Sequence, residues 1–283
     1  MKRQNRVVYY RDPLRDDFAD THIQTESIPP EYPFVRTSPL YRIAAFLLYY
    51  LVAIPLVWLI TKVYLGLRIR GRRHLRGLRG GVYLYGNHTQ PLDAFLGPLV
   101  AFPRRAYVIC NPDAVSIPGL RTVVQMLGGI PIPETRAAMP GFLQALRRRV
   151  EQGAAVTIFP EAHIWPFCTG IRPFPDVSFR YPAEEGRPAV AMVATYRRRR
   201  GLFFWCRRPG MTLTVSEPFY PDPALPRREA RQKLRDQVYA FMRRYADAPD
   251  NVSYIRYVQI PAEEETAGGE VCRADGQSVP AAE

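Results

Sequence analysis

The chain has 283 residues, 47% of them hydrophobic, which suffices for one α/β domain with a membrane element and terminal tails. Its 39 Lys and Arg residues outnumber 26 Asp and Glu residues, so the net charge of +13 favours anionic partners such as membrane lipid or an acidic protein. Nucleic acid would attract the same charge, but no nucleic-acid-binding motif accompanies it. We therefore expect no nucleic-acid partner. The sequence does not indicate which oligomeric state the protein adopts.

Two segments precede the predicted globular domain. Residues 1–39 combine charged residues with prolines, which predicts an irregular arm. Residues 40–66 are hydrophobic, and their central stretch, 43–61, contains no charged residue. As a helix this stretch would be about 28 Å long, close to the hydrocarbon thickness of a bilayer, which predicts membrane association. Pro55 could divide it into two shorter helices in one leaflet, and a buried core helix is the alternative interpretation.

The charges around this segment predict its orientation. The twenty residues before position 43 contain only two cations, Arg36 and Arg42. The cations that follow are Lys62, Arg68, Arg70, Arg72, Arg73, Arg76 and Arg79. Because cations accumulate on the cytoplasmic side of a membrane segment, the domain is expected on that side.

Between residues 67 and 261, predicted strands and helices alternate. The strands are expected at 82–85, 106–109, 129–132, 155–159, 189–196 and 211–216, and the helices at 92–102, 119–127, 140–152 and 227–245. This alternation predicts an α/β fold with a mixed, mostly parallel sheet flanked by helices. Residues 262–283 are rich in Glu, Gly, Ser and Ala and are expected to be disordered.

A histidine and an aspartate follow the first of these strands. His88 and Asp93 have four residues between them, and Gly86-Asn87 ends the strand, so His88 lies where open α/β sheets place their ligand crevices. Thr89 or Asp93 would cap the next helix and turn the carboxylate back toward the imidazole. An imidazole held at Nδ1 keeps Nε2 free to accept a proton from a hydroxyl. The pair predicts a general base and its orienting group, although a chance His-Asp pair is the alternative.

Polar or glycine residues mark two further strands. Phe159-Pro160-Glu161-Ala162-His163 brings a carboxylate and a second imidazole to the end of the strand at 155–159. Gly129 opens the strand at 129–132, where the absence of a side chain allows another backbone to approach closely. We therefore expect one site built at neighbouring strand ends.

In their order and spacing, these blocks resemble those of the glycerophospholipid acyltransferases, in particular the lysophosphatidate (1-acylglycerol 3-phosphate) acyltransferases. His88 and Asp93 match the first block, Gly129–Pro133 is similar to the second, Phe159–Glu161 matches the start of the third, and 189–195 corresponds loosely to the fourth. The resemblance covers roughly residues 67–220. It implies fatty acyl transfer from acyl-CoA or acyl-carrier protein in phospholipid biosynthesis, with no metal and no cofactor besides this co-substrate.

The resemblance also implies roles for the matched residues. His88 would remove the acceptor hydroxyl's proton as the oxygen attacks the thioester, while Asp93 fixes the imidazole tautomer. Glu161 would position the acceptor's hydroxyls. The tetrahedral oxyanion also needs hydrogen-bond donors, and we expect them from backbone amides near Gly128 and Gly129.

The chain departs from the family pattern where the acceptor's phosphate is expected to bind. Ala162-His163-Ile164 replaces the usual glycine, threonine and arginine of the third block, and Pro133-Glu134 stands where the second block usually has an arginine. Arg136, Arg172 or Arg180 could substitute, because a guanidinium fork suits phosphate wherever it reaches.

The stretch 162–180 is rich in aromatic residues and proline, which predicts an ordered loop at the site. Within it, His163 could donate to a phosphate or pack against Trp165. Cys168 could be interpreted as a nucleophile, but a buried bystander is the simpler interpretation, and the spacing of the four cysteines indicates neither zinc nor a disulfide framework. The altered third block keeps two alternatives open: a catalytically altered lipid-binding protein, or an ester hydrolase that uses the same dyad. No Gly-x-Ser-x-Gly elbow supports a serine hydrolase.

Overall fold

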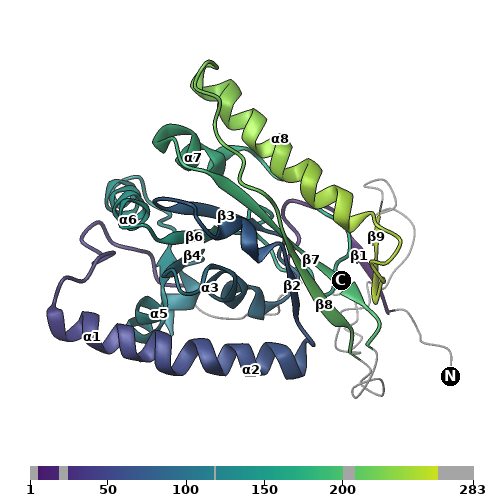
Figure 1. The fold of residues 1–283 in the computed structure, drawn as a ribbon, viewed down its shortest axis with the longest axis horizontal. Coiled ribbons are helices and arrows are strands. Elements are labelled where there is room, and N and C mark those ends of the chain that lie inside the picture. The colour runs from purple at the N-terminus through teal and green to yellow at the C-terminus, as the bar shows by residue number, and fades with distance from the viewer. Residues whose placement is uncertain (1–5, 19–24, 118, 200–207, 261–283) are drawn as a thin grey trace, which may run out of the picture.

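A seven-stranded sheet forms the centre of the molecule (Figure 1). The computed structural model describes residues 6–18, 25–117, 119–199 and 208–260. The sheet order is β2-β8-β7-β3-β6-β4-β5, and every neighbouring pair is parallel except β7 with β8. The strands are β2 (Arg68–Arg70), β3 (Val82–Gly86), β4 (Ala106–Cys110), β5 (Gly129–Pro131), β6 (Ala155–Ile158), β7 (Ala189–Arg197) and β8 (Gly210–Val215). The predicted mixed, mostly parallel sheet is confirmed.

Helices cover both faces of this sheet (Figure 1). On one face lie α6 (Met139–Glu151), α7 (Arg180–Glu185) and α8 (Arg227–Ala246), with a 3-10 turn, η4 (Val177–Phe179), before α7. On the other lie α1 (Pro39–Leu47), η1 (Leu48–Ala53), α2 (Ile54–Tyr64), η2 (Arg72–Leu75), η3 (Pro91–Phe95), α3 (Leu96–Ala101), α4 (Asp113–Ser116) and α5 (Arg121–Leu127). The central strands are therefore enclosed on both sides.

The alternation of side chains along β3 shows how the core is divided. Tyr83 and Tyr85 pack in the cluster beneath α6 and α8, whereas Val82 and Leu84 pack in the cluster beneath α3. All four are fully buried. Successive side chains of a strand point to opposite faces, so a strand covered on both faces is apolar throughout. For this reason the continuous apolar run predicted the strand correctly.

Most predicted elements of the domain are present, with bounds shifted by a few residues. The structure adds a short strand, β2, and divides the helix expected at 92–102 into η3 and α3. It also places η4 and α7 at the end of the expected loop 162–180. The tail predicted to be disordered, 262–283, lies outside the described residues.

The hydrophobic segment forms one continuous helix from Pro39 to Tyr64, through a π-helical stretch, η1, and past Pro55. The expected division at Pro55 is therefore not observed. By length and composition the helix could cross a membrane, yet it lies along the domain beside α3 and α5 (Figure 1). Tyr49 is buried on the inner side, and its hydroxyl oxygen accepts a hydrogen bond of 3.1 Å from the Ala106 amide. Most of the helix remains exposed, so it is not a buried core helix.

The N-terminal arm is more ordered than the sequence indicated. Its β1 (Arg6–Tyr10) pairs in parallel with β9 (Ile255–Gln259) in a separate two-stranded sheet. Further along, Ile28 and Tyr32 are buried against Val115. The prediction of an irregular arm was wrong for β1, whose partner strand lies far away in the sequence, whereas Ile28 and Tyr32 lie in irregular backbone.

Candidate active site

The loop after β3 carries the predicted pair and begins with a close contact between backbone and ring. A Cβ atom added to Gly86 would lie 2.8 Å from the Phe159 ring, so only glycine fits there without movement. The next turn, η3, is capped by Gln90 and Asp93 in a capping box, with Pro91 at its start. The expected cap by Thr89 or Asp93 is thus replaced by a shared cap, in which Asp93 is the third residue of the turn.

The structure brings His88 and Asp93 together. His88 Nδ1 lies 3.4 Å from Asp93 Oδ2, a long contact of the kind that can shorten when substrate binds. The same carboxylate oxygen accepts hydrogen bonds from the Thr89 amide at 2.6 Å and the Gln90 amide at 2.7 Å. Asp93 is fully buried, whereas the His88 side chain is 14% exposed. A fixed carboxylate therefore faces Nδ1.

The His88 ring is also held on its flat side. It stacks on Phe159 with ring centroids 4.3 Å apart and planes inclined by 18°. In the described part of the chain, Nδ1 is the ring nitrogen with a hydrogen-bond partner. Nε2 is therefore available to a proton donor that enters from solvent.

Two residues that the sequence did not single out as functional anchor this loop to β7. Asn87 forms two hydrogen bonds with the Ala194 backbone, donating to its oxygen at 3.1 Å and accepting from its amide at 2.8 Å. The Tyr196 hydroxyl donates to Thr89 Oγ1 at 2.7 Å and accepts from Gln90 Nε2 at 3.1 Å. Burial raises the pKa of Tyr196, with Asp93 adding to the rise, so its hydroxyl stays protonated. The sequence signal for this anchoring was the run of polar residues at 87–90, directly after an apolar strand.

Glu161 lies beside the pair but points into the protein. Its Oε2 accepts a hydrogen bond from the His88 amide at 3.2 Å, and its Oε1 accepts one from the Arg172 amide at 3.1 Å. The Arg172 guanidinium donates to Oε2 at 3.1 Å. Both side chains are 5% exposed or less. Burial raises the pKa of Glu161, and Arg172 opposes that rise. Glu161 therefore joins the loops after β3 and β6.

A family model described as Acyltransferase matches residues 66–208, about half of the chain. The chain belongs to the acyltransferase family. Among solved structures, the crystal structure of the 1-acyl-sn-glycerophosphate (LPA) acyltransferase PlsC from Thermotoga maritima is similar, with 17% sequence identity and a TM-score of 0.47. The match covers 72% of this chain and 86% of that one. No curated protein matches the chain.

The predicted resemblance is confirmed at the level of this family, and the chain is an acyltransferase. In this acyltransferase, the loop that follows β6 lies under the N-terminal arm. His163 Nδ1 is 3.4 Å from Asp17 Oδ2, and the Trp165 indole donates to the Asp16 carbonyl at 2.8 Å. Trp165 is buried, and it stacks on Tyr257 rather than on His163. The arm thus fixes the outer side of this loop.

The arginines predicted to bind phosphate differ in their availability. Arg172 is buried, paired with Glu161, and also donates to the His163 carbonyl. In this arrangement it does not fit the expected role of an open phosphate-binding residue, because its side chain is buried and both of its terminal nitrogens already donate within the protein. Arg180 is half-exposed and lies 3.7 Å from Glu184, and Arg136 is exposed in the segment after β5.

Gly129 lies away from the dyad. It begins β5, and β6 and β4 separate that strand from β3, which places it about 14 Å away laterally. The neighbouring Gly128 amide donates to the Gln125 carbonyl as a helix cap. The expected oxyanion donors at Gly128 and Gly129 are therefore not brought together with His88.

The cysteines show no sign of a nucleophile or a metal site where the structure describes them. Cys168 is buried, and burial raises the pKa of its thiol to about 11, so it would remain protonated at neutral pH. Within the described residues, no group of three or more His, Cys, Asp or Glu side chains could hold a metal ion. Cys206 and Cys272 lie outside those residues.

Proposed function

We propose that this acyltransferase moves a fatty acyl group from acyl-CoA or acyl-carrier protein to the hydroxyl of a lysophospholipid-type acceptor, with 1-acylglycerol 3-phosphate as the acceptor. The observation that carries the proposal is the buried Asp93 carboxylate facing Nδ1 of a partly exposed His88. A free Nε2 on a partly exposed ring suits proton removal from an incoming hydroxyl.

In the proposed reaction, His88 Nε2 accepts the proton of the acceptor hydroxyl as its oxygen attacks the thioester carbonyl carbon. The tetrahedral intermediate then collapses, the carbon–sulfur bond breaks, and the thiolate takes the proton from the imidazolium. Asp93 holds the imidazole tautomer and stabilises the cation while the proton is on the ring. No covalent acyl-enzyme is required.

Glu161 and Arg172 support this reaction indirectly. Their buried ion pair at 3.1 Å and the hydrogen bond from the His88 amide to Glu161 fix the backbone that carries the base. We therefore propose that both act as positioning residues, which revises the role first expected for Glu161. Arg136 and Arg180 remain the candidates for the acceptor's phosphate, because their guanidinium groups are accessible.

We also propose that the helix Pro39–Tyr64 holds the enzyme on one leaflet of the membrane, with the domain on the cytoplasmic side. Its inner face packs on the domain, so the helix cannot cross a bilayer without leaving these contacts. Its outer face exposes large apolar side chains. Those with more than half of their surface exposed include Leu40, Ile43, Phe46, Leu51, Leu56, Trp58 and Leu59. Such a face suits the boundary between headgroups and acyl chains.

The test of the reaction is incubation of the purified full-length protein with radiolabelled acyl-CoA or acyl-carrier protein and a panel of lysolipids. Formation of labelled diacyl lipid from 1-acylglycerol 3-phosphate is the expected result. Labelled free fatty acid would instead indicate hydrolysis, and donor binding without turnover would indicate a lipid-binding protein. Equal use of a lysolipid without a phosphomonoester would contradict the proposed acceptor.

A further inference from the structure

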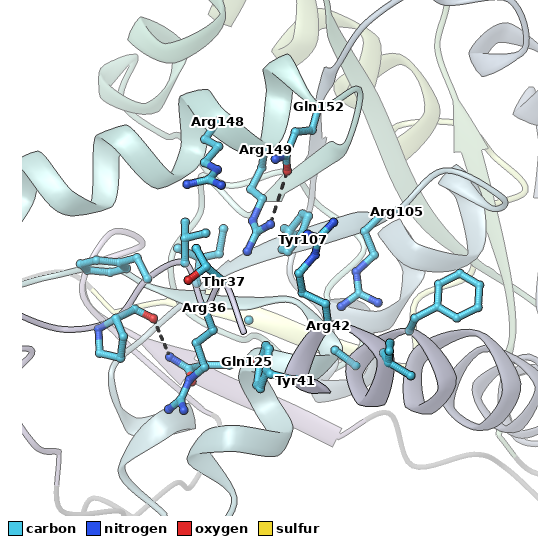
Figure 2. A pocket seen from close by; sticks show the side chains of 18 of the residues that line it. Arg36, Thr37, Tyr41, Arg42, Arg105, Tyr107, Gln125, Arg148, Arg149 and Gln152 are labelled. Carbon is cyan, nitrogen blue, oxygen red and sulfur yellow. Dashed lines mark hydrogen bonds between the residues drawn. The ribbon is translucent and has the colours of Figure 1, made fainter. Parts of the chain in front are cut away.

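A large cavity lies beside the start of the apolar helix, away from the dyad. Its volume is about 690 Å³, and it lies between α1, the segment 33–37, the end of α6 and the start of β4 (Figure 2). Five arginines line it: Arg36, Arg42, Arg105, Arg148 and Arg149. We call this cavity the arginine pocket. The proposed reaction does not use it.

The charge of the arginine pocket is not balanced by the protein. Its lining contains no Asp or Glu, and none of its five arginines forms an ion pair among the described residues. Arg148 and Arg149 extend from α6 toward the same space that Arg42 enters from α1 (Figure 2). Like charges held together in this way raise the energy of the empty site, so an anion would be stabilised there.

Aromatic rings hold two of the guanidinium groups in place. Arg105 lies over the Tyr49 ring at 3.6 Å from its centroid, and Arg149 lies over Tyr107 at 4.6 Å. Stacking uses the flat face of a guanidinium and leaves its N–H edge for hydrogen bonds, of which Arg105 donates one to the Met126 carbonyl and Arg149 one to Gln152. Arg149 Nε is buried without a hydrogen-bond partner. Arg42 and Arg148 are exposed to solvent, whereas the stacked guanidinium groups of Arg105 and Arg149 are half-buried and fixed, which suits the binding of phosphate oxygens.

The position of the pocket selects the source of the phosphate. Ile43 and Phe46 line the pocket, and each has more than half of its surface exposed on the apolar helix. If that helix lies in the membrane interface, the pocket opens at the depth of the lipid headgroups. A phospholipid could then keep its acyl chains beside Ile43 and Phe46 while its phosphate reaches the arginines.

The pocket is distinct from the catalytic site. Arg105 directly precedes β4, where Ala106 is level with Val82 at the beginning of β3. His88 follows the opposite end of β3, six residues beyond Val82, so the two sites are separated by on the order of 20 Å. A phosphate in the pocket cannot belong to an acceptor whose hydroxyl is at His88, because that phosphate and hydroxyl share one glycerol.

We infer that the arginine pocket binds the headgroup phosphate of an anionic membrane phospholipid, separately from the substrates, and so anchors the acyltransferase on anionic membranes. This inference rests on the proposed membrane association, but not on the proposed reaction.

The test compares binding of the full-length protein to vesicles by flotation. One set consists of phosphatidylcholine alone, and the other contains a minor fraction of phosphatidylglycerol. The pocket variant is Arg148→Gln/Arg149→Gln, and the control is Arg227→Gln/Arg228→Gln, which removes the same charge from exposed residues at the start of α8, a helix that does not line the pocket. We expect the pocket variant to lose roughly 10- to 30-fold in affinity for anionic vesicles and to bind phosphatidylcholine vesicles as the wild type does.

The control variant should lose less than about 3-fold, since its charges lie away from the pocket. Equal losses in both variants would overturn the inference in favour of a diffuse electrostatic attraction. Full displacement from anionic vesicles by millimolar glycerol 3-phosphate would also overturn it, because the pocket would then take a soluble phosphate. We expect the wild-type protein to stay bound to anionic vesicles in the presence of glycerol 3-phosphate.

Acyl transfer measured in neutral detergent with the same preparations separates this inference from the proposed reaction. The pocket variant should keep wild-type turnover there. Lipid discrimination without any acyl transfer would refute only the proposed reaction, whereas wild-type protein that binds neither kind of vesicle would refute both the anchor and the headgroup site.

Discussion

The loops that follow β3 and β6 lie side by side, yet they are held in different ways. The first loop, 86–93, is fixed by hydrogen bonds within itself and to the adjacent strand β7, through Asn87 and Tyr196. The second, 159–172, is fixed by the buried pair of Glu161 and Arg172 and by the N-terminal arm. The first matches the sequence pattern expected from the resemblance to the glycerophospholipid acyltransferases, and the second departs from it.

From this difference we expect the first loop to carry the chemistry and the second loop to hold it in position. In the first loop, a partly exposed imidazole faces solvent while its neighbours are buried. In the second, the charged groups nearest the dyad are directed at each other. Changes in the first loop should therefore alter turnover with little change in stability, and changes in the second should alter stability first.

The largest expected effect on turnover without loss of structure is that of Asp93→Asn. The asparagine oxygen can still accept the Thr89 and Gln90 amides, but the amide group no longer fixes the imidazole tautomer or stabilises its cation. We expect kcat to fall by about 100- to 10,000-fold. Steady-state acyl transfer, with circular dichroism as the control for folding, measures this. Wild-type kcat in a folded variant would show that Asp93 does not orient the base.

Arg172→Ala should produce the largest loss of stability. It leaves the Glu161 carboxylate buried without its cation, which costs about 3–5 kcal/mol in free energy of unfolding. The matched control is Arg243→Ala, which breaks an exposed ion pair with Asp247 and should cost less than about 1 kcal/mol. Thermal denaturation of both variants compares them directly.

The deficit of Arg172→Ala should also depend on pH. Burial raises the pKa of Glu161, and loss of Arg172 removes the main opposing influence. A carboxyl whose pKa is raised in the folded state stabilises it at low pH, and that contribution is lost as the pH rises above the unfolded value. The variant should therefore be closest to wild type in acid. A deficit that grows in acid would contradict this explanation.

A smaller effect is expected from Arg180→Ala and Arg136→Ala. If either guanidinium binds the acceptor's phosphate, its removal should raise the acceptor KM by about 10-fold and leave the donor KM unchanged. Kinetics with 1-acylglycerol 3-phosphate as the varied substrate measure this. If both variants keep the wild-type KM, another group binds the acceptor and the sequence-based assignment of these arginines is wrong.

The smallest expected effect is that of Tyr196→Phe, which removes the hydroxyl that links Thr89 and Gln90. Loss of these hydrogen bonds should cost about 1–2 kcal/mol of stability. Turnover should fall by less than about 10-fold, because the Asn87 contacts still hold the loop on β7. Thermal denaturation and kcat together test whether the Asn87 contacts alone are enough to hold the first loop in place. A complete loss of activity would show that Tyr196 acts in the reaction itself.

The sequence was sufficient where local pattern controls structure. The apolar runs at β3, β6 and β7 predicted buried strands, because a strand that is covered on both faces must be apolar along its whole length. The spacing of His88 and Asp93 predicted their contact, since one turn of chain returns the carboxylate to the imidazole.

The sequence was insufficient where a residue's partner is chosen by the tertiary structure. Arg172 could have faced solvent or Glu161, and only the packed loop decides between them. The pairing of β1 with β9 joins the two ends of the described chain, so no local pattern shows it. Pro55 does not interrupt its helix, because it lies in the first turn of α2, after the π-helical stretch η1.

The most direct test of the central claim is the turnover of His88→Ala in acyl transfer from a labelled thioester to 1-acylglycerol 3-phosphate. The account predicts a fall of about 100- to 10,000-fold, because the only proposed base is removed. It also predicts a melting temperature close to wild type, since the ring is partly exposed and its hydrogen bond with Asp93 is long. A folded variant with wild-type turnover would contradict the mechanism.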